Sequence, residues 1–344
     1  METILGIDLA TWWFLVVGGV FSGYAILDGF DLGAGALHLF FKKEESRRIA
    51  LNAIGPVWDG NEVWLVIGGG ALFAGFPLVY ATVFSSFYEL FMVFLVMLIF
   101  RAISIEFRSK EPMRWWRRMW DISYSLSSIL IALSLGLVLG NVILGIPFDK
   151  DFIFRGHFSD FFNPYALLIA VTSLALFMMH GAIYLVMKTE NRLYTKLTIL
   201  VKNTTIFFVL MFALTSVTTL LYVPHMVNRY KEVPYMFGFP VLAILAVANI
   251  TRQISKRKYR LAFASSSVVA GLLLVLVAVG LYPNILISTL DPNFHLTVHN
   301  SASTTKTLRI LLTIAAIGVP LVAVYTSFVF WTFRGKVKLD ENSY

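Results

Sequence analysis

Long apolar runs separated by short polar stretches extend over almost the whole chain. A helix that crosses a bilayer needs about 20 predominantly apolar residues. The pattern therefore predicts an all-α polytopic membrane protein, a single integral membrane domain over residues 1–344. The nine predicted transmembrane helices cover residues 12–40, 53–75, 77–104, 121–145, 164–187, 203–223, 235–254, 261–282 and 308–333.

The first eight of these helices are expected to form two four-helix bundles, with the ninth at the periphery. Residues 26–29 (ILDG) precede a charged loop, and residues 178–181 (MMHG) precede another. A parallel repeat would relate helices 1–4, at about 12–145, to helices 5–8, at about 164–282. Two similar helix ends in a glycine-rich apolar chain explain the likeness equally well, so the repeat stays open.

Lys and Arg gather in every second connection between the predicted helices. Cytoplasmic loops carry an excess of these residues, so the rich connections are expected inside the cell. The N-terminus is therefore predicted outside and the C-terminus in the cytoplasm. The rich connections contain Lys42, Lys43, Arg47 and Arg48, then Arg108, Lys110, Arg114, Arg117 and Arg118, then Lys188, Arg192 and Lys196, then Lys256, Arg257, Lys258 and Arg260, and finally Arg334, Lys336 and Lys338.

Composition excludes several other classes of protein. Hydrophobic residues make up 58% of the chain and charged residues only 14%, whereas soluble domains carry about 25% charged residues. The formal charge of +8 is dispersed over short loops, which argues against a nucleic-acid-binding face. The chain has no cysteine, so it has no disulfides or thiolate metal sites. No Lys or Arg precedes the first apolar run, so we expect that run to be a retained helix.

Six ionisable residues interrupt the first three apolar runs. An ionisable side chain within the hydrocarbon layer costs about 3 kcal/mol or more, so each one is a candidate for function. The first two helices each carry a pair of acids three residues apart, a spacing that places both on one side of a helix. The six are Asp28 and Asp31 in the first helix, Asp59 and Glu62 in the second, and Glu89 and Arg101 in the third.

The predicted orientation brings most of these residues to one depth near the cytoplasm. The four acids of the first two helices, with Arg101, Asn61 and the neighbouring Trp58, are expected to converge there. Glu89 lies about 18 Å further up the third helix, near the membrane midplane. A cluster of acids with interacting titrations can hold and pass protons, which makes this layer a candidate proton entrance. In the alternative, structural interpretation, Arg101 pairs with an acid and the others meet water or headgroups.

Haem bound within a membrane bundle needs inward-facing ligands such as histidine. Only His180 falls near the middle of a predicted helix. His180 with Met178 or Met179 could ligate haem, but a histidine hydrogen-bonded within the bundle is the favoured interpretation.

Three stretches in the first third of the chain resemble the signature blocks of cytochrome bd quinol oxidase subunit II. Further similarity extends over essentially the whole chain, including Trp120–Asp121, Gly140–Asn141 and residues 180–182. The three main stretches are residues 27–33 (LDGFDLG), residues 56–65 (PVWDGNEVWL) running into 69–74 (GGALFA), and Phe100–Arg101 followed by residues 106–108 (EFR).

This resemblance implies a heterodimer with a larger subunit I, in the bacterial cytoplasmic membrane. Subunit I would carry two b-type haems and one d-type haem, oxidise quinol near the outer face and reduce O₂ to water with cytoplasmic protons. The present chain would support assembly and line a proton route, with Asp59 and the Asp28–Asp31 block in the positions assigned to that role. The resemblance leaves open whether a structural quinone, a lipid or a small accessory subunit is also bound.

Two positions depart from the family pattern. Some members have histidine where this chain has Val57, so a proton step through that histidine is absent here. Glu89 occupies a position that is apolar in well-known members of the family. Its place in the route is therefore inferred from this sequence alone. A proton-coupled secondary transporter remains the alternative function, since such proteins also use repeats and midplane carboxylates.

Overall fold

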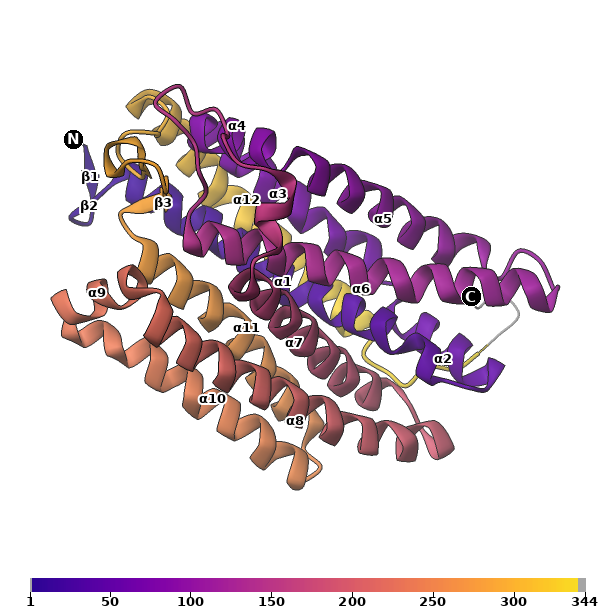
Figure 1. Ribbon diagram of the computed structural model, residues 1–344. Helices are drawn as coiled ribbons and strands as arrows, with labels where there is room; N and C mark the ends of the chain where they lie inside the picture. Colours follow the sequence, from indigo (N-terminus) through magenta and orange to yellow (C-terminus); the bar gives the residue numbers. More distant parts are fainter. Residues whose placement is uncertain (1, 340–344) are drawn as a thin grey trace.

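The computed structural model describes residues 2–339, and nearly all of its regular structure is helical. Long helices lie side by side in one bundle, with small strand pairs at one end (Figure 1). The helices are α1 (Leu9–Leu37), α2 (Glu44–Ile54), α3 (Trp58–Gly75), α4 (Pro77–Ser86), α5 (Tyr88–Phe107), α6 (Arg114–Leu144), α7 (Pro164–Lys188), α8 (Asn191–Tyr222), α9 (Pro224–Glu232), α10 (Gly238–Ser255), α11 (Tyr259–Leu281) and α12 (Thr305–Thr332). The strands are β1 (Thr3–Ile4), β2 (Ile7–Asp8), β3 (Asn284–Leu286) and β4 (Leu296–Thr297), in the antiparallel pairs β1–β2 and β3–β4.

Within residues 2–339, eight helical segments are long and apolar enough to cross a membrane. They comprise α1 with the following 3₁₀ turn, α5, α6, α7, α8, α10 with the turn before it, α11 and α12. The predicted second helix corresponds to α3, which has 18 residues but carries Asp59 and Glu62 near its start. The mean hydropathy of α3 is therefore lower than that of the other eight segments.

The helix predicted at 53–75 begins later than expected. Residues up to Ile54 belong to α2, a separate helix in the connection after α1, and α3 starts only at Trp58. Pro56 lies between them and has no backbone N–H to donate, which favours a helix break at this point. Val57 then takes a non-helical conformation with φ −128°.

The helix predicted at 77–104 is divided at Phe87 into α4 and α5. The backbone hydrogen bonds continue across the division, because Phe87 N donates to Val83 O and Phe91 N donates to Phe87 O. Just before it, the hydroxyl groups of Thr82 and Ser85 donate to backbone carbonyls of the same helix. Such back-bonding bends helices, so the division is a kink in one continuous rod.

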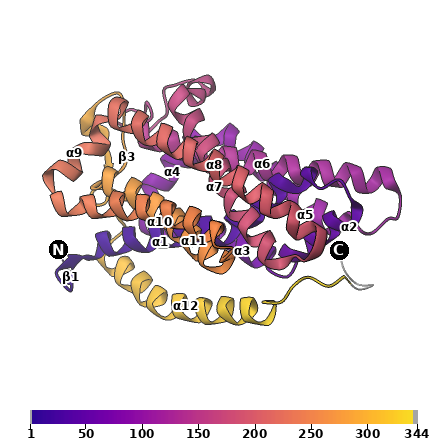
Figure 2. The same ribbon diagram turned by 90° about the horizontal axis from the view of Figure 1, so that it is seen from below.

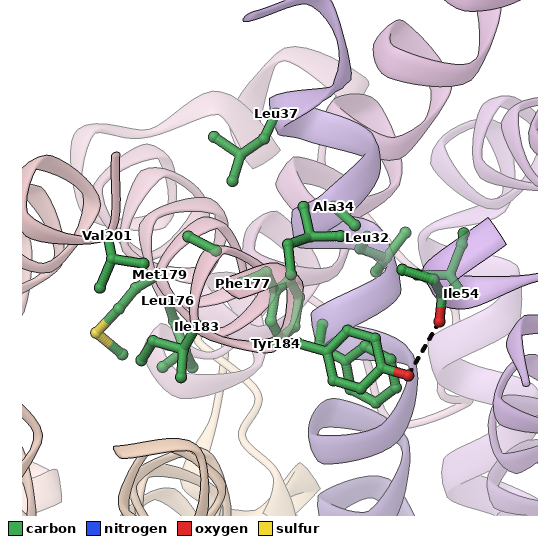
Figure 3. Close-up of a cluster of buried hydrophobic side chains, with 14 of the residues drawn as sticks. Leu32, Ala34, Leu37, Ile54, Leu176, Phe177, Met179, Ile183, Tyr184 and Val201 are labelled. Atoms are coloured by element: carbon green, nitrogen blue, oxygen red, sulfur yellow. Dashed lines mark hydrogen bonds between the residues drawn. The ribbon is translucent and has the colours of Figure 1, made fainter. Parts of the chain in front are cut away.

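The core forms where α1 packs against α7 with almost no side chain between the two backbones. A Cβ added to Gly33 would lie 1.8 Å from Phe177 O, and one added to Gly181 would lie 2.5 Å from Ala34 N. Small residues allow such close approach in membrane bundles. Around this crossing, buried apolar side chains fill the interior, and the Tyr184 hydroxyl donates to Ala53 O at 3.1 Å (Figure 3).

The two ends of the chain lie at opposite ends of the bundle. The N-terminal strand pair and β3 occupy one end, and α2 and the C-terminal segment occupy the other (Figure 1). The final described residues return to the α7–α8 connection, where Val337 N donates to Lys188 O at 3.0 Å. Helix α12 runs along the outside (Figure 2), and Leu308 is the only buried residue of this helix.

Candidate functional site

A fully buried guanidinium lies at the centre of the charged cluster. Helix α5 contributes Arg101, α1 contributes Asp28, and both side chains are 0% exposed. Arg101 donates two hydrogen bonds to Asp28, Nη1 to Oδ2 at 3.0 Å and Nη2 to Oδ1 at 2.5 Å. A third bond, at 3.3 Å, runs from Nη1 to Glu62 Oε2 of α3. Three helices are thus joined through one side chain.

Asp31 adds a further buried carboxylate one turn along α1. Its Oδ2 accepts a hydrogen bond of 2.7 Å from Asn61 Nδ2, which comes from the first turns of α3. Its Oδ1 is buried and has no hydrogen-bond partner among the described residues. Trp58, at the start of α3, is buried in the adjoining apolar core. The predicted meeting of Asp28, Asp31, Glu62, Asn61 and Arg101 is therefore observed.

Asp59 and Glu89 are not enclosed in this cluster. Both side chains are exposed on the surface of the chain. Asp59 precedes the inward-facing Asn61 by two residues, about 200° around α3, so it faces away from Asp31. Glu89 is twelve residues from Arg101, about 120° around α5. Asp59 thus lies outside the buried contacts, although its charge acts on Glu62, three residues further along α3. Its part in the proton route stays a prediction.

A second buried charge network, not expected from the sequence, lies closer to α2 than the first. Asp121 of α6 accepts from His38 Nε2 at 2.5 Å, from Arg108 Nε at 2.6 Å and from Arg47 Nη1 at 2.8 Å. Arg108 also donates two bonds to Glu44 of α2, at 3.0 and 3.1 Å. This network fastens α2 to the ends of α1, α5 and α6.

Electrostatics at the second network favour the charged form of Arg108, which follows the last residue of α5. Burial alone would lower the pKa of Arg108, but hydrogen bonds and charges from Asp121 and Glu44 raise it above the ordinary arginine value. The sequence contained one indication of this network, the Trp120–Asp121 pair beside a basic loop. Spacing along the chain could not show that His38 and Asp121, 83 residues apart, are in contact.

His180 is a bonded core residue of α7. Its Nδ1 is 2.7 Å from Ser266 Oγ, and its Nε2 is 3.0 Å from Ile26 O. The ring also stacks on Phe263, with ring centroids 4.6 Å apart. Since both ring nitrogens are engaged and the side chain is 0% exposed, His180 does not fit the role of a haem ligand.

A lateral groove runs along the seam between α10 and α11, with a volume of about 290 Å³. Its polar atoms form a ladder, in which Gln253 Nε2 donates to Asn249 Oδ1 at 3.0 Å and Asn249 Nδ2 donates to Ser265 Oγ at 2.8 Å. The other lining residues are Ala246, Leu261, Ala264 and Val268. The groove is therefore apolar over most of its length, with amide groups toward the loop that carries Lys256–Arg260.

The described helices and charges define an integral membrane protein that shelters an acid–arginine cluster between its spanning helices. By sequence, residues 9–333 match the family described as cytochrome bd terminal oxidase subunit II. The chain belongs to that family. It is thus a subunit of a respiratory quinol:oxygen oxidoreductase, located in the bacterial cytoplasmic membrane.

Individual relatives agree with this assignment. The chain is 30% identical to cytochrome bd-I ubiquinol oxidase subunit 2 of Escherichia coli, over 96% of this chain and 95% of the relative. It is 30% identical to cytochrome bd ubiquinol oxidase subunit 2 of Bacillus subtilis, over 96% of this chain and 97% of the relative. The fold resembles a chain in the structure of bd oxidase from Geobacillus thermodenitrificans, with a TM-score of 0.76, 18% identity and coverage of 94% and 98%.

Proposed function

We propose that this chain holds and delivers cytoplasmic protons for the oxidase through the cluster around Arg101. Three carboxylates, Asp28, Asp31 and Glu62, adjoin a single guanidinium. Fully ionised, they would give the cluster an excess of two negative charges inside the bundle, which is costly in a membrane interior. Such a group is expected to retain protons and to exchange them as its members titrate together.

The exposed acids extend the proposed route at two ends. Asp59, in the first turn of α3, lies close enough to Glu62 for their charges to interact, and it forms the entrance. Glu89 would continue the route beyond the cluster, on a face that this chain itself leaves open. For Glu89 to take part, a partner subunit must cover that face.

We also propose nine crossings, with the N-terminus outside and the C-terminus in the cytoplasm. Two contacts support the ninth crossing by showing that α3 runs the length of α1. Near its start Asn61 bonds Asp31, and at its end Gly75 packs against Trp13. The first and last described residues lie at opposite ends of the bundle in Figure 1, which supports an odd number of crossings.

The proposed partner is subunit I, which would carry the two b-type haems and the d-type haem and would oxidise quinol. The bonding of both nitrogens of His180 supports placing the haems in another chain. The groove between α10 and α11 suits a lipid acyl chain, with the headgroup beside Lys256 and Arg257. A structural quinone and a small accessory subunit are alternatives that extraction of the purified complex would identify.

The test is to isolate the chain from its native membrane and compare it with variants of the cluster. We expect a haem-bearing partner to copurify, quinol-driven oxygen consumption, and no haem absorbance from this chain alone. Asp31→Asn and Glu62→Gln should each slow turnover, roughly tenfold, by removing a proton-carrying group. The haem spectrum should stay unchanged, because the haems are proposed to lie in the partner subunit.

The control is Glu232→Gln, an exposed acid of α9 outside the cluster. Normal oxygen consumption in both cluster variants would contradict the proton route. Stoichiometric haem in the isolated chain would contradict the assignment of haem to the partner. Substrate uptake by proteoliposomes containing only this chain would instead support a proton-coupled transporter.

A further inference from the structure

One side of α1 carries a line of polar positions from the membrane cluster to the cytoplasmic network. Asp28, Asp31, Gly35 and His38 are separated by three, four and three residues, so they share a side of the helix. Asp31 and His38 are about 10 Å apart along the axis. Gly35, between them, has no side chain.

The space beside Gly35 is filled by two side chains of α6, Ser128 and Tyr124. A Cβ added to Gly35 would lie 2.0 Å from Ser128 Oγ and 3.1 Å from Tyr124 Cζ, the ring carbon that bears the hydroxyl. The Tyr124 ring also meets the His38 ring edge to face, with centroids 5.1 Å apart. Tyr124 is 2% exposed. The Tyr124 phenol thus lies beside the part of α1 that separates Asp31 from His38.

Three groups along this line, Asp31, Tyr124 and His38, each have one polar atom without a partner among the described residues. These atoms are His38 Nδ1, the Tyr124 hydroxyl and Asp31 Oδ1, and all three are buried. The other polar atoms are engaged, since Asp31 Oδ2 accepts from Asn61 and His38 Nε2 contacts Asp121. Buried polar groups without protein partners are commonly satisfied by ordered internal water.

The His38 end of the line connects to the polar surface. Asp121 holds His38 Nε2 and also accepts from Arg47, whose side chain is 22% exposed. Because Asp121 only accepts hydrogen bonds when ionised, it assigns the ring proton to Nε2 and leaves Nδ1 as an acceptor. His38 therefore presents Nδ1 to internal water on the side of the ring that faces away from Asp121.

We propose that internal water bridges His38 Nδ1, the Tyr124 hydroxyl and Asp31 Oδ1, making Tyr124 the link that passes protons between the two networks. A hydroxyl accepts one proton as it releases another, so Tyr124 returns to its neutral form after each transfer. This inference rests on the proposed function, because the acid cluster is the destination of the proton. It adds an entrance inside the subunit to the one proposed at Asp59.

The experiment uses the assembled oxidase with Tyr124→Phe, which removes only the hydroxyl oxygen. Turnover is expected to fall roughly three- to tenfold, with a larger slowing in D₂O than in the unmodified complex and an unchanged haem spectrum. Tyr165→Phe is the matched control, since Tyr165 is also a buried tyrosine, and its hydroxyl bonds Thr219 at 2.9 Å, away from this line. The control is expected to leave both readouts unchanged.

A second variant separates a shared route from two independent effects. If His38 and Tyr124 act in series, His38→Leu combined with Tyr124→Phe should be no slower than the slower single variant. Multiplication of the two single effects would overturn the proposal. Normal turnover and a normal D₂O effect in Tyr124→Phe would also overturn it, while slow turnover of Glu62→Gln in the same assay would leave the proposed function standing.

Discussion

At the scale of single residues, the pairing of Arg101 with Asp28 explains how a charge persists inside the bundle. Both side chains are completely buried, and two parallel hydrogen bonds join them. This paired geometry is the strongest that a guanidinium and a carboxylate can adopt. A buried ion pair adds little net stability, yet removing one partner leaves an uncompensated charge. Arg101 is therefore structurally required by the acids that it holds.

Replacing Arg101 should consequently do more damage than replacing a surface arginine. Arg101→Leu is expected to destabilise the chain by about 3–5 kcal/mol, seen as a lower Tm and a reduced yield of assembled complex. Arg309→Leu is the control, because Arg309 is 64% exposed and pairs with Glu2 at the surface. It should change stability by less than about 1 kcal/mol.

The double variant Arg101→Leu with Asp28→Leu distinguishes pairing from simple loss of volume. Removing both charges should restore part of the lost stability, since no buried charge then remains unpaired at that contact. A double variant less stable than Arg101→Leu alone would contradict this account.

At the scale of helices, the crossing of α1 and α7 sets the geometry of the acidic side of α1. Gly33 and Gly181 allow the backbones to touch. Asp31 lies two residues before Gly33 on α1, so the distance between these two helices fixes how far its carboxylate reaches toward α3. Packing of backbone on backbone thus positions a polar group on the other side of the same helix.

Gly33→Ala is expected to force the two helices apart. A Cβ at this position would lie 1.8 Å from Phe177 O, and backbone cannot rotate away as a side chain can. Overpacking typically costs about 1–3 kcal/mol, so Tm and complex yield should fall. Gly18→Ala, at a position in the same helix where nothing lies within 4 Å, should be tolerated. Equal Tm values for the two variants would refute the close crossing.

At the scale of the whole molecule, charge and shape agree on a direction through the membrane. The rich connections after α1, α5 and α7 gather at the end that also holds α2 and the C-terminal segment (Figure 1). The strand pairs gather at the other end. The proposed orientation follows from the basic residues, and the acid cluster then lies toward the cytoplasmic side.

The absence of cysteine makes this orientation directly measurable, because one introduced thiol reports without background from the chain itself. In right-side-out vesicles, Asp151→Cys, in the exposed α6–α7 connection, should react with a membrane-impermeant maleimide. Lys43→Cys, in the exposed connection after α1, should react only after the vesicles are opened. Reaction of both thiols in sealed vesicles would place them on one side and contradict the three crossings proposed between Lys43 and Asp151.

Much of this architecture could be predicted from the sequence, because apolar length and loop charge act locally. The break at Pro56 and the kink at Phe87 were missed, since an apolar run does not show where its helix bends. Asp59 shares a side of α3 with Glu62 but lies about 200° from Asn61, and spacing alone does not show which of these directions is buried. The contacts of Asp121 with His38 and Arg47 depend on helices distant in the sequence, and no spacing rule reveals them.

The exposed carboxylate of Glu89 also has a consequence for the life of the protein before assembly. Inserted without a partner, the chain would present this acid to acyl chains, at a penalty of about 3 kcal/mol unless it is neutralised or lifted toward water. Newly made copies would therefore tilt, associate or be degraded until a matching surface shields the acid. A single side chain can in this way couple the survival of one gene product to the supply of another.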